Sequence, residues 1–220
     1  MRLVTVLLVL SLAAAAWAGP SIVGSMNGWN PGDPAMDMTL NPYGVWELTL
    51  TLPAGHYEYK AVETDAWDGN DFPANNQVFD LAAETTVTFL ANFGANVGVK
   101  EGDEYVTHQN PVVVGNFMHL LGGNDWDPAD HTGEMTDNGD GTYTFTATLP
   151  QGNYDIKVTF NDNWDQDTVG FGQNVPFCSN GADPVVFVYH MANNQLDVFD
   201  CQGPVATDDH SWSAVKGLYR

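Results

Sequence analysis

Basic residues are scarce in this chain: six Lys and Arg stand against 28 Asp and Glu, for a formal net charge of -22. Nucleic acids and anionic membranes are bound through basic surfaces, so this composition argues against both as partners. A neutral ligand is compatible with so few cations. An acidic surface that only keeps the protein soluble is equally compatible.

Recognisable catalytic motifs are also missing. The six histidines are scattered, without the H-x-H or H-E-x-x-H spacing of metal sites, and no G-x-S-x-G is present. No pair of acids stands out as a glycosidase pair. The acidic stretch at 137–141, DNGDG, lacks the spaced ligands and closing Glu of a calcium loop, and it favours a hairpin turn over a calcium site. We therefore expect no enzyme activity, no cofactor and no metal.

Long hydrophobic runs are confined to the first residues. The apolar stretch at 3–12 is shorter than the ~20 residues of a membrane-spanning helix. Arg2 precedes it, and Ala16-Trp17-Ala18 forms a cleavage site before Gly19, which favours a signal peptide over 1–18 rather than a membrane anchor. Loss of Arg2 would move the net charge from -22 to -23. We expect a secreted or extracytoplasmic bacterial protein with no membrane insertion after signal removal.

Cysteine is nearly absent, with Cys178 and Cys201 as the only two. In an exported chain such a pair favours a disulfide over two unpaired thiols. A bridge here would hold only the second half of the chain, so we expect a structural role.

The chain contains an internal repeat with an offset of 97 residues. From Trp29 to Asp68, 17 of 40 positions are identical to Trp126–Asp165. Upstream, IVGSMNGW matches VVGNFMHLLGGNDW with six extra residues in the second copy, directly before Trp126. The repeat predicts two copies of one domain, at 20–100 and 112–202, joined by a polar linker at 101–111 and followed by a tail at 203–220.

Each copy has the pattern of β-structure. In WELTLTL at 46–52, apolar and polar residues alternate, and a second strand places Tyr57 and Tyr59 on one face. Trp46 falls on the inward face and is interpreted as a core residue. Short strands recur in NQVFDL, TTVTFLA and PVVFVYH, without convincing helical periodicity between residues 20 and 200. The fold class is therefore predicted to be all-β, with one β-sandwich per copy.

Four outward-facing positions recur in both copies. Lys60 and Lys157 end the phrases AGHYEYK and QGNYDIK, on the face opposite the inward-facing side chains. Each is also placed to form a solvated ion pair with an acid two residues earlier, a contact of little energetic value. The tryptophans are Trp29, Trp67, Trp126 and Trp164, all in polar loops. They are candidates for a contact surface, or they fold back as lids on the sandwich.

A tryptophan pair, a lysine and nearby amides suit a sugar. An indole covers the apolar C–H face of a pyranose, and Lys, Asn and Gln bind its hydroxyls. One lysine per copy suffices because the ligand is uncharged.

The ordered set GSMNGW, VWELTLTLPAGHYEYKAV, DAWD and NNQVFDL resembles the family-48 carbohydrate-binding modules, which include the glycogen-binding domain of AMP-activated protein kinase β-subunits. The second copy, NDWDPA followed by TLPQGNYDIKVTFNDNWD, is similar to early-set modules attached to bacterial pullulanases and amylopullulanases. The resemblance implies two tandem immunoglobulin-like (early-set) β-sandwiches that bind α-1,4-glucan, as polysaccharide or oligosaccharide.

By position, the resemblance implies two sets of carbohydrate-binding residues. The first set is Trp29, Lys60, Trp67 and Asn75 or Asn76, and the second is Trp126, Lys157, Trp164 and Gln173 or Asn174. The loop after Trp67 is shorter than in the pullulanase pattern, so the choice between the two asparagines stays open.

The expected function is non-catalytic α-glucan binding by a secreted protein. Two alternatives remain: a structural or adhesive surface protein that uses the fold without a sugar site, and an accessory subunit of a separate amylolytic enzyme. The tail ends in SWSAVKGLYR, with Trp212, Val215 and Tyr219 at helical spacing. It is interpreted as a sorting or docking segment, a short helix against the second domain, or a disordered end.

Overall fold

The computed structural model describes residues 19–67, 71–93, 104–167, 173–201 and 203–206. The predicted signal peptide and most of the predicted tail lie outside these ranges. The described chain is all-β, as the sequence predicted: its helices are four 3-10 turns, η1 (Ser25–Asn27), η2 (Pro34–Met36), η3 (Met118–Leu121) and η4 (His131–Gly133). None of the helices in these ranges has the length and hydrophobicity needed to cross a lipid bilayer.

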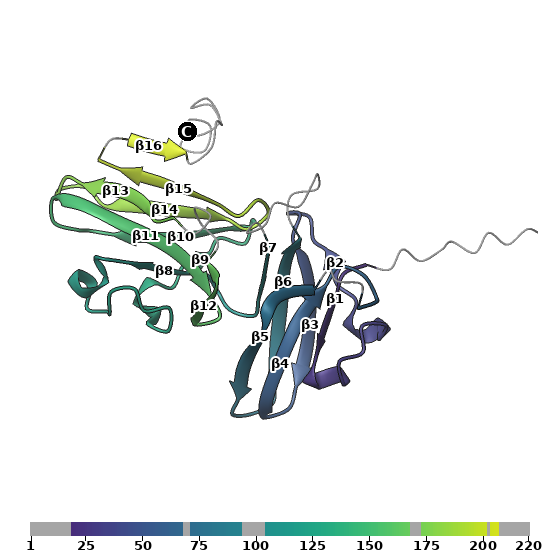
Figure 1. Ribbon diagram of the computed structural model, residues 1–220. Helices are drawn as coiled ribbons and strands as arrows, with labels where there is room; N and C mark the ends of the chain where they lie inside the picture. Colours follow the sequence, from purple (N-terminus) through teal and green to yellow (C-terminus); the bar gives the residue numbers. More distant parts are fainter. Residues whose placement is uncertain (1–18, 68–70, 94–103, 168–172, 202, 207–220) are drawn as a thin grey trace, which may run out of the picture.

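The first half, residues 19–107, contains two antiparallel sheets (Figure 1). One has the order β1-β4-β5, with bounds Ser21–Gly24, Gly55–Val62 and Asp71–Leu81. The other has the order β2-β3-β6-β7, with bounds Thr39–Leu40, Trp46–Leu52, Thr85–Phe93 and Glu104–Thr107. Their inner faces share one core, in which Tyr59 and Ala61 from the first sheet meet Phe89 and Ala91 from the second.

The second half, residues 112–206, repeats this arrangement of two sheets. In one sheet, β11 (Gly152–Phe160) pairs with β8 (Val112–Gly115), β12 (Asn163–Asp167) and β13 (Val175–Ser179). The other has the order β16-β15-β14-β10-β9, with bounds Gly203–Ala206, Gln195–Asp200, Val185–His190, Thr142–Ala147 and Thr136–Asp137. Strands β9 and β10 form a hairpin around residues 138–141, which confirms the predicted turn.

Several hydrogen bonds recur at equivalent positions of the two halves. The Tyr57 hydroxyl donates to the carbonyl of Pro53, and the Tyr154 hydroxyl donates to that of Pro150. The carboxylates of Asp33 and Asp130 cap η2 and η4 respectively. The internal similarity of the sequence therefore extends to local structure.

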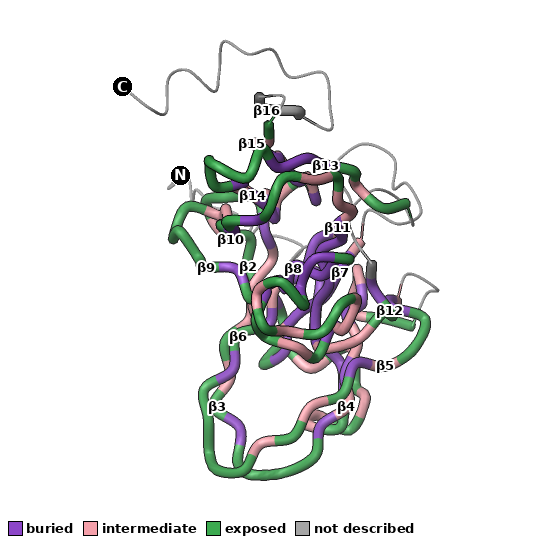
Figure 2. Tube along the Cα trace, turned by 90° about the vertical axis from the view of Figure 1, so that its left-hand side faces the viewer, coloured by how far each residue is buried: buried purple, intermediate pink, exposed green. Residues whose placement is uncertain are grey.

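The connection between the halves is more ordered than a polar linker. Residues 104–107 of the predicted linker form β7, which pairs with β6. Tyr105 is fully buried, belongs to the core cluster of the second half, and donates a hydrogen bond from its hydroxyl to the carbonyl of Met191 (2.8 Å). Figure 2 shows the resulting band of buried residues through β7, β8 and β11. The two halves therefore share a packed interface.

The predicted disulfide is confirmed. Cys178 of β13 is bonded to Cys201, directly after β15, with a Cα–Cα distance of 5.5 Å. The bridge links the two sheets of the second half, in keeping with a structural role.

Candidate carbohydrate-binding surfaces

Trp29 and Trp126 adopt the same unusual backbone conformation. Their φ angles are 61° and 56°, in the left-handed region that bulky residues rarely enter. Each backbone N–H donates to a glycine carbonyl at the end of the first strand of its half, that of Gly24 at 2.9 Å and that of Gly115 at 3.2 Å. The six extra residues before Trp126 are accommodated without loss of this hydrogen bond. Both indoles remain partly exposed.

The loop before Trp126 is fixed by a neighbouring acid. Asp125 accepts hydrogen bonds from the backbone N–H and the Nδ1 of His119, at 2.9 and 2.8 Å. Slight desolvation acts to raise the pKa of Asp125, but the hydrogen bonds and the charge of His119 outweigh it, so this pKa is lowered. The carboxylate therefore stays ionised and holds the extra residues in place beside the tryptophan.

Lys60 lies on the outer face of β4, as predicted. Its neighbours Tyr59 and Ala61 point into the core, whereas its Nζ donates to the Oδ2 of Asp71 (2.8 Å). The side chains of Lys60 and Asp71 are 14% and 28% exposed, so the ion pair is partly desolvated. One of its three N–H donors is used by Asp71, and no other described residue is recorded as accepting from the Lys60 ammonium group.

The expected asparagine lies close to Lys60 in register. Tyr59 pairs with Gln77, and the register of β5 then shifts by several residues before Ala61 pairs with Phe72. Asn75 and Asn76 fall within this shift. Asn75 is exposed, whereas the side chain of Asn76 donates to the Oε2 of Glu58 (3.0 Å).

The second half repeats the lysine and amide with a more buried lysine. Lys157 is on the outer face of β11, opposite Val114 of β8, but only 8% of it is exposed. Ile156 pairs with Val175, so the preceding residue Asn174 lies beside Lys157 in register. Gln173 and Asn174 are both exposed.

Trp67 and Trp164 are among the most exposed large hydrophobic side chains of the described residues, at 49% and 44%. Trp67 lies in the loop between β4 and β5, as expected. Trp164 does not lie in a loop: it is on the short strand β12, which pairs with β11. Trp46, predicted to be core, is partly buried against the core of the first half.

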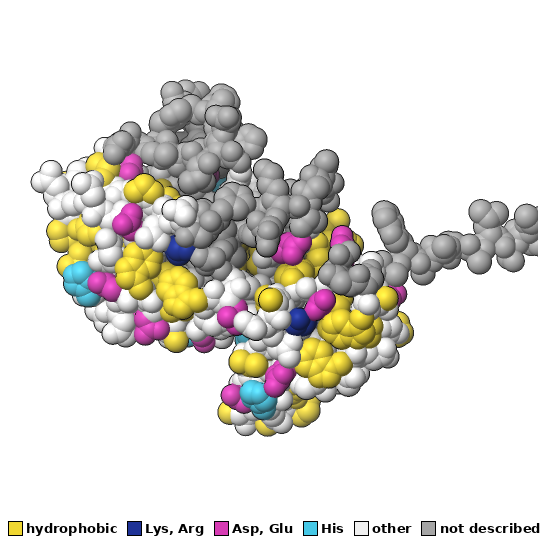
Figure 3. Space-filling model, in the orientation of Figure 1, with side chains coloured by type: hydrophobic (Ala, Val, Ile, Leu, Met, Phe, Trp, Pro, Cys, Tyr) yellow, Lys and Arg dark blue, Asp and Glu magenta, His cyan; other side chains and the backbone are white. Residues whose placement is uncertain are grey.

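Both lysines face the same side of the molecule. Lys60 and Lys157 are the only Lys or Arg residues within the described ranges, so they are the two dark-blue groups of Figure 3. Each is bordered by hydrophobic side chains. Each half therefore has one lysine beside hydrophobic side chains on this face, and Lys157 is the more buried of the two.

Sequence reasoning missed the partners of these residues. The pairing of Lys60 with Asp71 is not predictable from the sequence, because Asp71 lies beyond a register shift that no periodicity encodes. Gln77, Asn161 and Asn163 join the two halves. Only two of them differ visibly between the copies: Asn161 and Asn163 replace Thr64 and Ala66 of the first copy, a change that does not by itself predict burial.

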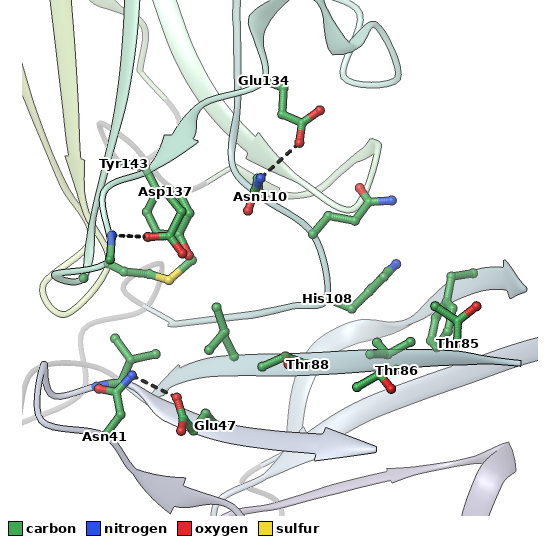
Figure 4. Close-up of a pocket in the computed structure, with 18 of the residues that line it drawn as sticks. Asn41, Glu47, Thr85, Thr86, Thr88, His108, Asn110, Glu134, Asp137 and Tyr143 are labelled. Carbon is green, nitrogen blue, oxygen red and sulfur yellow. Dashed lines mark hydrogen bonds between the residues drawn. The ribbon is translucent and has the colours of Figure 1, made fainter. Parts of the chain in front are cut away.

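A cleft of about 750 Å³ also lies between the halves (Figure 4), but it holds none of the predicted site residues. Its lining includes four carboxylates and no Lys or Arg. Many of its polar groups are already paired: Thr88 with Thr49, Glu47 with Asn41, and Glu134 with Asn110. No group of three or more metal-ligating side chains occurs within the described ranges.

Comparison with known proteins gives a consistent family. The family profile described as the Pullulanase X25 domain matches residues 14–97 and 110–196. An amylopullulanase of Thermoanaerobacterium thermosulfurigenes is 32% identical over 192 residues, covering 81% of this chain and 10% of the relative. An amylopullulanase of Thermoanaerobacter thermohydrosulfuricus is 33% identical over 154 residues, covering 66% of this chain and 10% of the relative.

Among solved structures, the pullulanase from Bacillus acidopullulyticus is similar, with a TM-score of 0.39 and 19% identity over 73% of this chain and 17% of that one. The chain spans about a tenth of the length of the two amylopullulanases. Since the profile matches most of its length, the chain belongs to the Pullulanase X25 domain family.

Proposed function

We propose that this protein is an exported, non-catalytic α-glucan-binding protein with one sugar site per half. The observation that carries the proposal is that Trp67 and Trp164 are both nearly half exposed and occupy equivalent positions of the repeat. Lys60 and Lys157 also occupy equivalent positions. Large aromatic side chains exposed at equivalent positions of both halves are candidates for a contact surface.

The chemistry of each surface supports a neutral sugar. Trp67 offers an indole for the C–H face of a glucose unit, and Trp29 offers a second, held by its backbone hydrogen bond. Lys60 supplies ammonium donors, while Asn75 and Asn76 supply amide groups for hydroxyls. In the second half the corresponding roles fall to Trp126, Lys157, Trp164 and either Gln173 or Asn174.

The relatives support the choice of an α-glucan, since both are named amylopullulanase. The match covers about 10% of each amylopullulanase, which supports the proposal that this chain corresponds to a part of those proteins without the catalytic residues. We further propose that each half is an immunoglobulin-like, early-set sandwich of the family-48 type. Service as an accessory subunit of a separate amylolytic enzyme is compatible with this function.

A structural or adhesive protein without a sugar site is the rival proposal. Affinity electrophoresis separates the two: the full chain is run in native gels containing soluble starch, glycogen or hydroxyethylcellulose. We expect starch and glycogen to slow the migration of the protein and hydroxyethylcellulose to leave it unchanged. This retardation should be lost in a Trp67→Ala/Trp164→Ala variant. Leu40→Ala, which truncates an exposed apolar residue of the other sheet, serves as the control.

Unchanged mobility of the wild-type protein in every gel would overturn α-glucan binding and leave the structural role. Incubation with starch tests the second part of the proposal. We expect no increase in reducing ends, and a steady increase that scales with protein concentration would contradict a non-catalytic role.

A further inference from the structure

The two sheets that carry the candidate sugar-binding residues meet at their edges. β5 is the edge strand of the sheet β1-β4-β5, and β12 is the edge strand of the sheet built on β11. These two strands contact each other, and both views of the molecule show them side by side (Figures 1 and 2). We call this contact the β5–β12 seam.

Buried hydrogen bonds hold the seam together. The Oε1 of Gln77 on β5 accepts from the Nδ2 atoms of Asn161 and Asn163, at 3.1 and 2.9 Å. Gln77 is 1% exposed and Asn161 is 5% exposed. Unpaired amides at such burial are costly, so the bonds favour one relative placement of the two sheets.

A second set of bonds fixes the same placement from β7. The side-chain amide of Gln166 on β12 accepts from the backbone N–H of Val106 (2.7 Å) and donates to its carbonyl (2.8 Å). The side-chain oxygen of Asn161 accepts from the Thr107 hydroxyl and from the backbone N–H of His108. Rotation of one half against the other would break these buried bonds together.

One candidate residue of each half stands directly beside the seam. Asn76 precedes Gln77 on β5, and Trp164 follows Asn163 on β12. Each candidate surface therefore has a member one residue away from a hydrogen bond that joins the halves. The two lysines also face the same side of the molecule (Figure 3).

We propose that the two surfaces form one continuous track, which holds a single linear α-glucan chain across the β5–β12 seam. This inference rests on the proposed function and specifies its ligand: a chain long enough to contact Trp67 and Trp164 together. Because the halves are fixed, the second contact is intramolecular once the first has formed, and no hinge has to be ordered.

Calorimetric titration of the full chain with maltotriose, maltoheptaose and a longer linear maltodextrin tests the track. We expect weak binding of maltotriose, and one long maltodextrin per protein bound roughly 10²- to 10⁴-fold more tightly. Trp67→Ala and Trp164→Ala should each reduce the long-chain affinity to nearly that of the short ligand. Both residues are exposed, so the variants are expected to fold, and Leu40→Ala should bind as wild type.

Two outcomes would overturn the track in distinguishable ways. Binding of two long maltodextrins per protein, with each single variant removing one of them and leaving the affinity of the other unchanged, would show two independent sites. That result would refute the track and keep the proposed function. No heat with any of the three ligands would refute both.

Discussion

Asn161 makes several of the hydrogen bonds that join the two halves, a set of contacts that we call the joint. Its side chain makes four hydrogen bonds to the first half and the connection: it accepts from Thr107 and His108 and donates to Gln77 and the carbonyl of Val106. Its φ of 55° lies in the left-handed region, which Asn adopts at lower cost than Ala. Asn161→Ala removes all four bonds and strains the backbone. Asn161→Gly removes the bonds and leaves the backbone relaxed.

The cost follows from what each partner retains. Three partners keep another bond: Gln77 to Asn163, Val106 to Gln166, and Thr107 to Gln109. Their three lost bonds are worth about 0.5–1 kcal/mol each, and the unpaired backbone N–H of His108 adds about 1–2 kcal/mol. We expect Asn161→Gly to destabilise the protein by about 3 kcal/mol, and Asn161→Ala by about 1 kcal/mol more.

Thermal unfolding followed by calorimetry measures both variants. At about 2–4 °C per kcal/mol for a chain of this size, Asn161→Gly should lower the Tm by roughly 10 °C and Asn161→Ala by a few degrees more. A loss below about 2 °C in both variants would refute the buried joint. Equal losses in the two variants would refute the backbone contribution and leave the hydrogen bonds as the whole effect.

Three further predictions concern single features. Burial lowers the pKa of His108 to about 4, whereas the pKa of this histidine in the unfolded chain is near 6.5, so the unfolded chain binds the proton first as the pH falls. The free energy of unfolding should therefore fall by up to about 3 kcal/mol between pH 6.5 and pH 4. Urea titrations at each pH measure this dependence, and His108→Gln should reduce it. Removal of the disulfide in Cys178→Ala/Cys201→Ala, whose ends are 23 residues apart, should cost about 3 kcal/mol in the same titration, and an unchanged midpoint would contradict its structural role. Trp67→Ala should change the free energy of unfolding by less than about 1 kcal/mol, because half of the side chain is exposed; a loss above about 3 kcal/mol would identify it as a lid on the core.

The all-β fold was predictable because its strongest signals are local. Alternation in Trp46–Leu52 and the inward Tyr57 and Tyr59 appear in the structure as β3 and β4, with both tyrosines buried. The disulfide followed from the presence of only two cysteines. These features depend on neighbouring residues or on simple counting, so tertiary context had little scope to change them.

The joint was not predictable, because its signals are short and polar. β7 lies within KEGDEYVTHQN, where charged residues before the strand and polar residues after it hide the four residues Glu104–Thr107, yet Tyr105 packs into the core of the second half. Asn161 and Gln77 look like surface residues in the sequence, since only the docking of the halves buries them. Their burial is a property of two segments that are distant in the chain.

The sequence allowed a prediction of which residues make up the candidate site more than of how they are arranged. Lys60 and Lys157 have the expected facing, but the burial of Lys157 to 8% and the Lys60–Asp71 ion pair depend on how adjacent strands shift in register. The left-handed backbone of Trp29 and Trp126 also has no sequence signature, because glycine is the usual residue there.

The most direct test of α-glucan binding is the indole N–H region of the ¹⁵N NMR spectrum of the full chain, recorded as maltoheptaose is added. Signals are assigned with single Trp→Phe variants, and cellohexaose is the control ligand. We expect maltoheptaose to shift the indole signals of Trp29, Trp67, Trp126 and Trp164, and to leave that of the core-packed Trp46 unchanged. If these four signals stay in place at millimolar maltoheptaose, the protein has no α-glucan site on these surfaces; if they move equally with cellohexaose, the surfaces do not select an α-glucan.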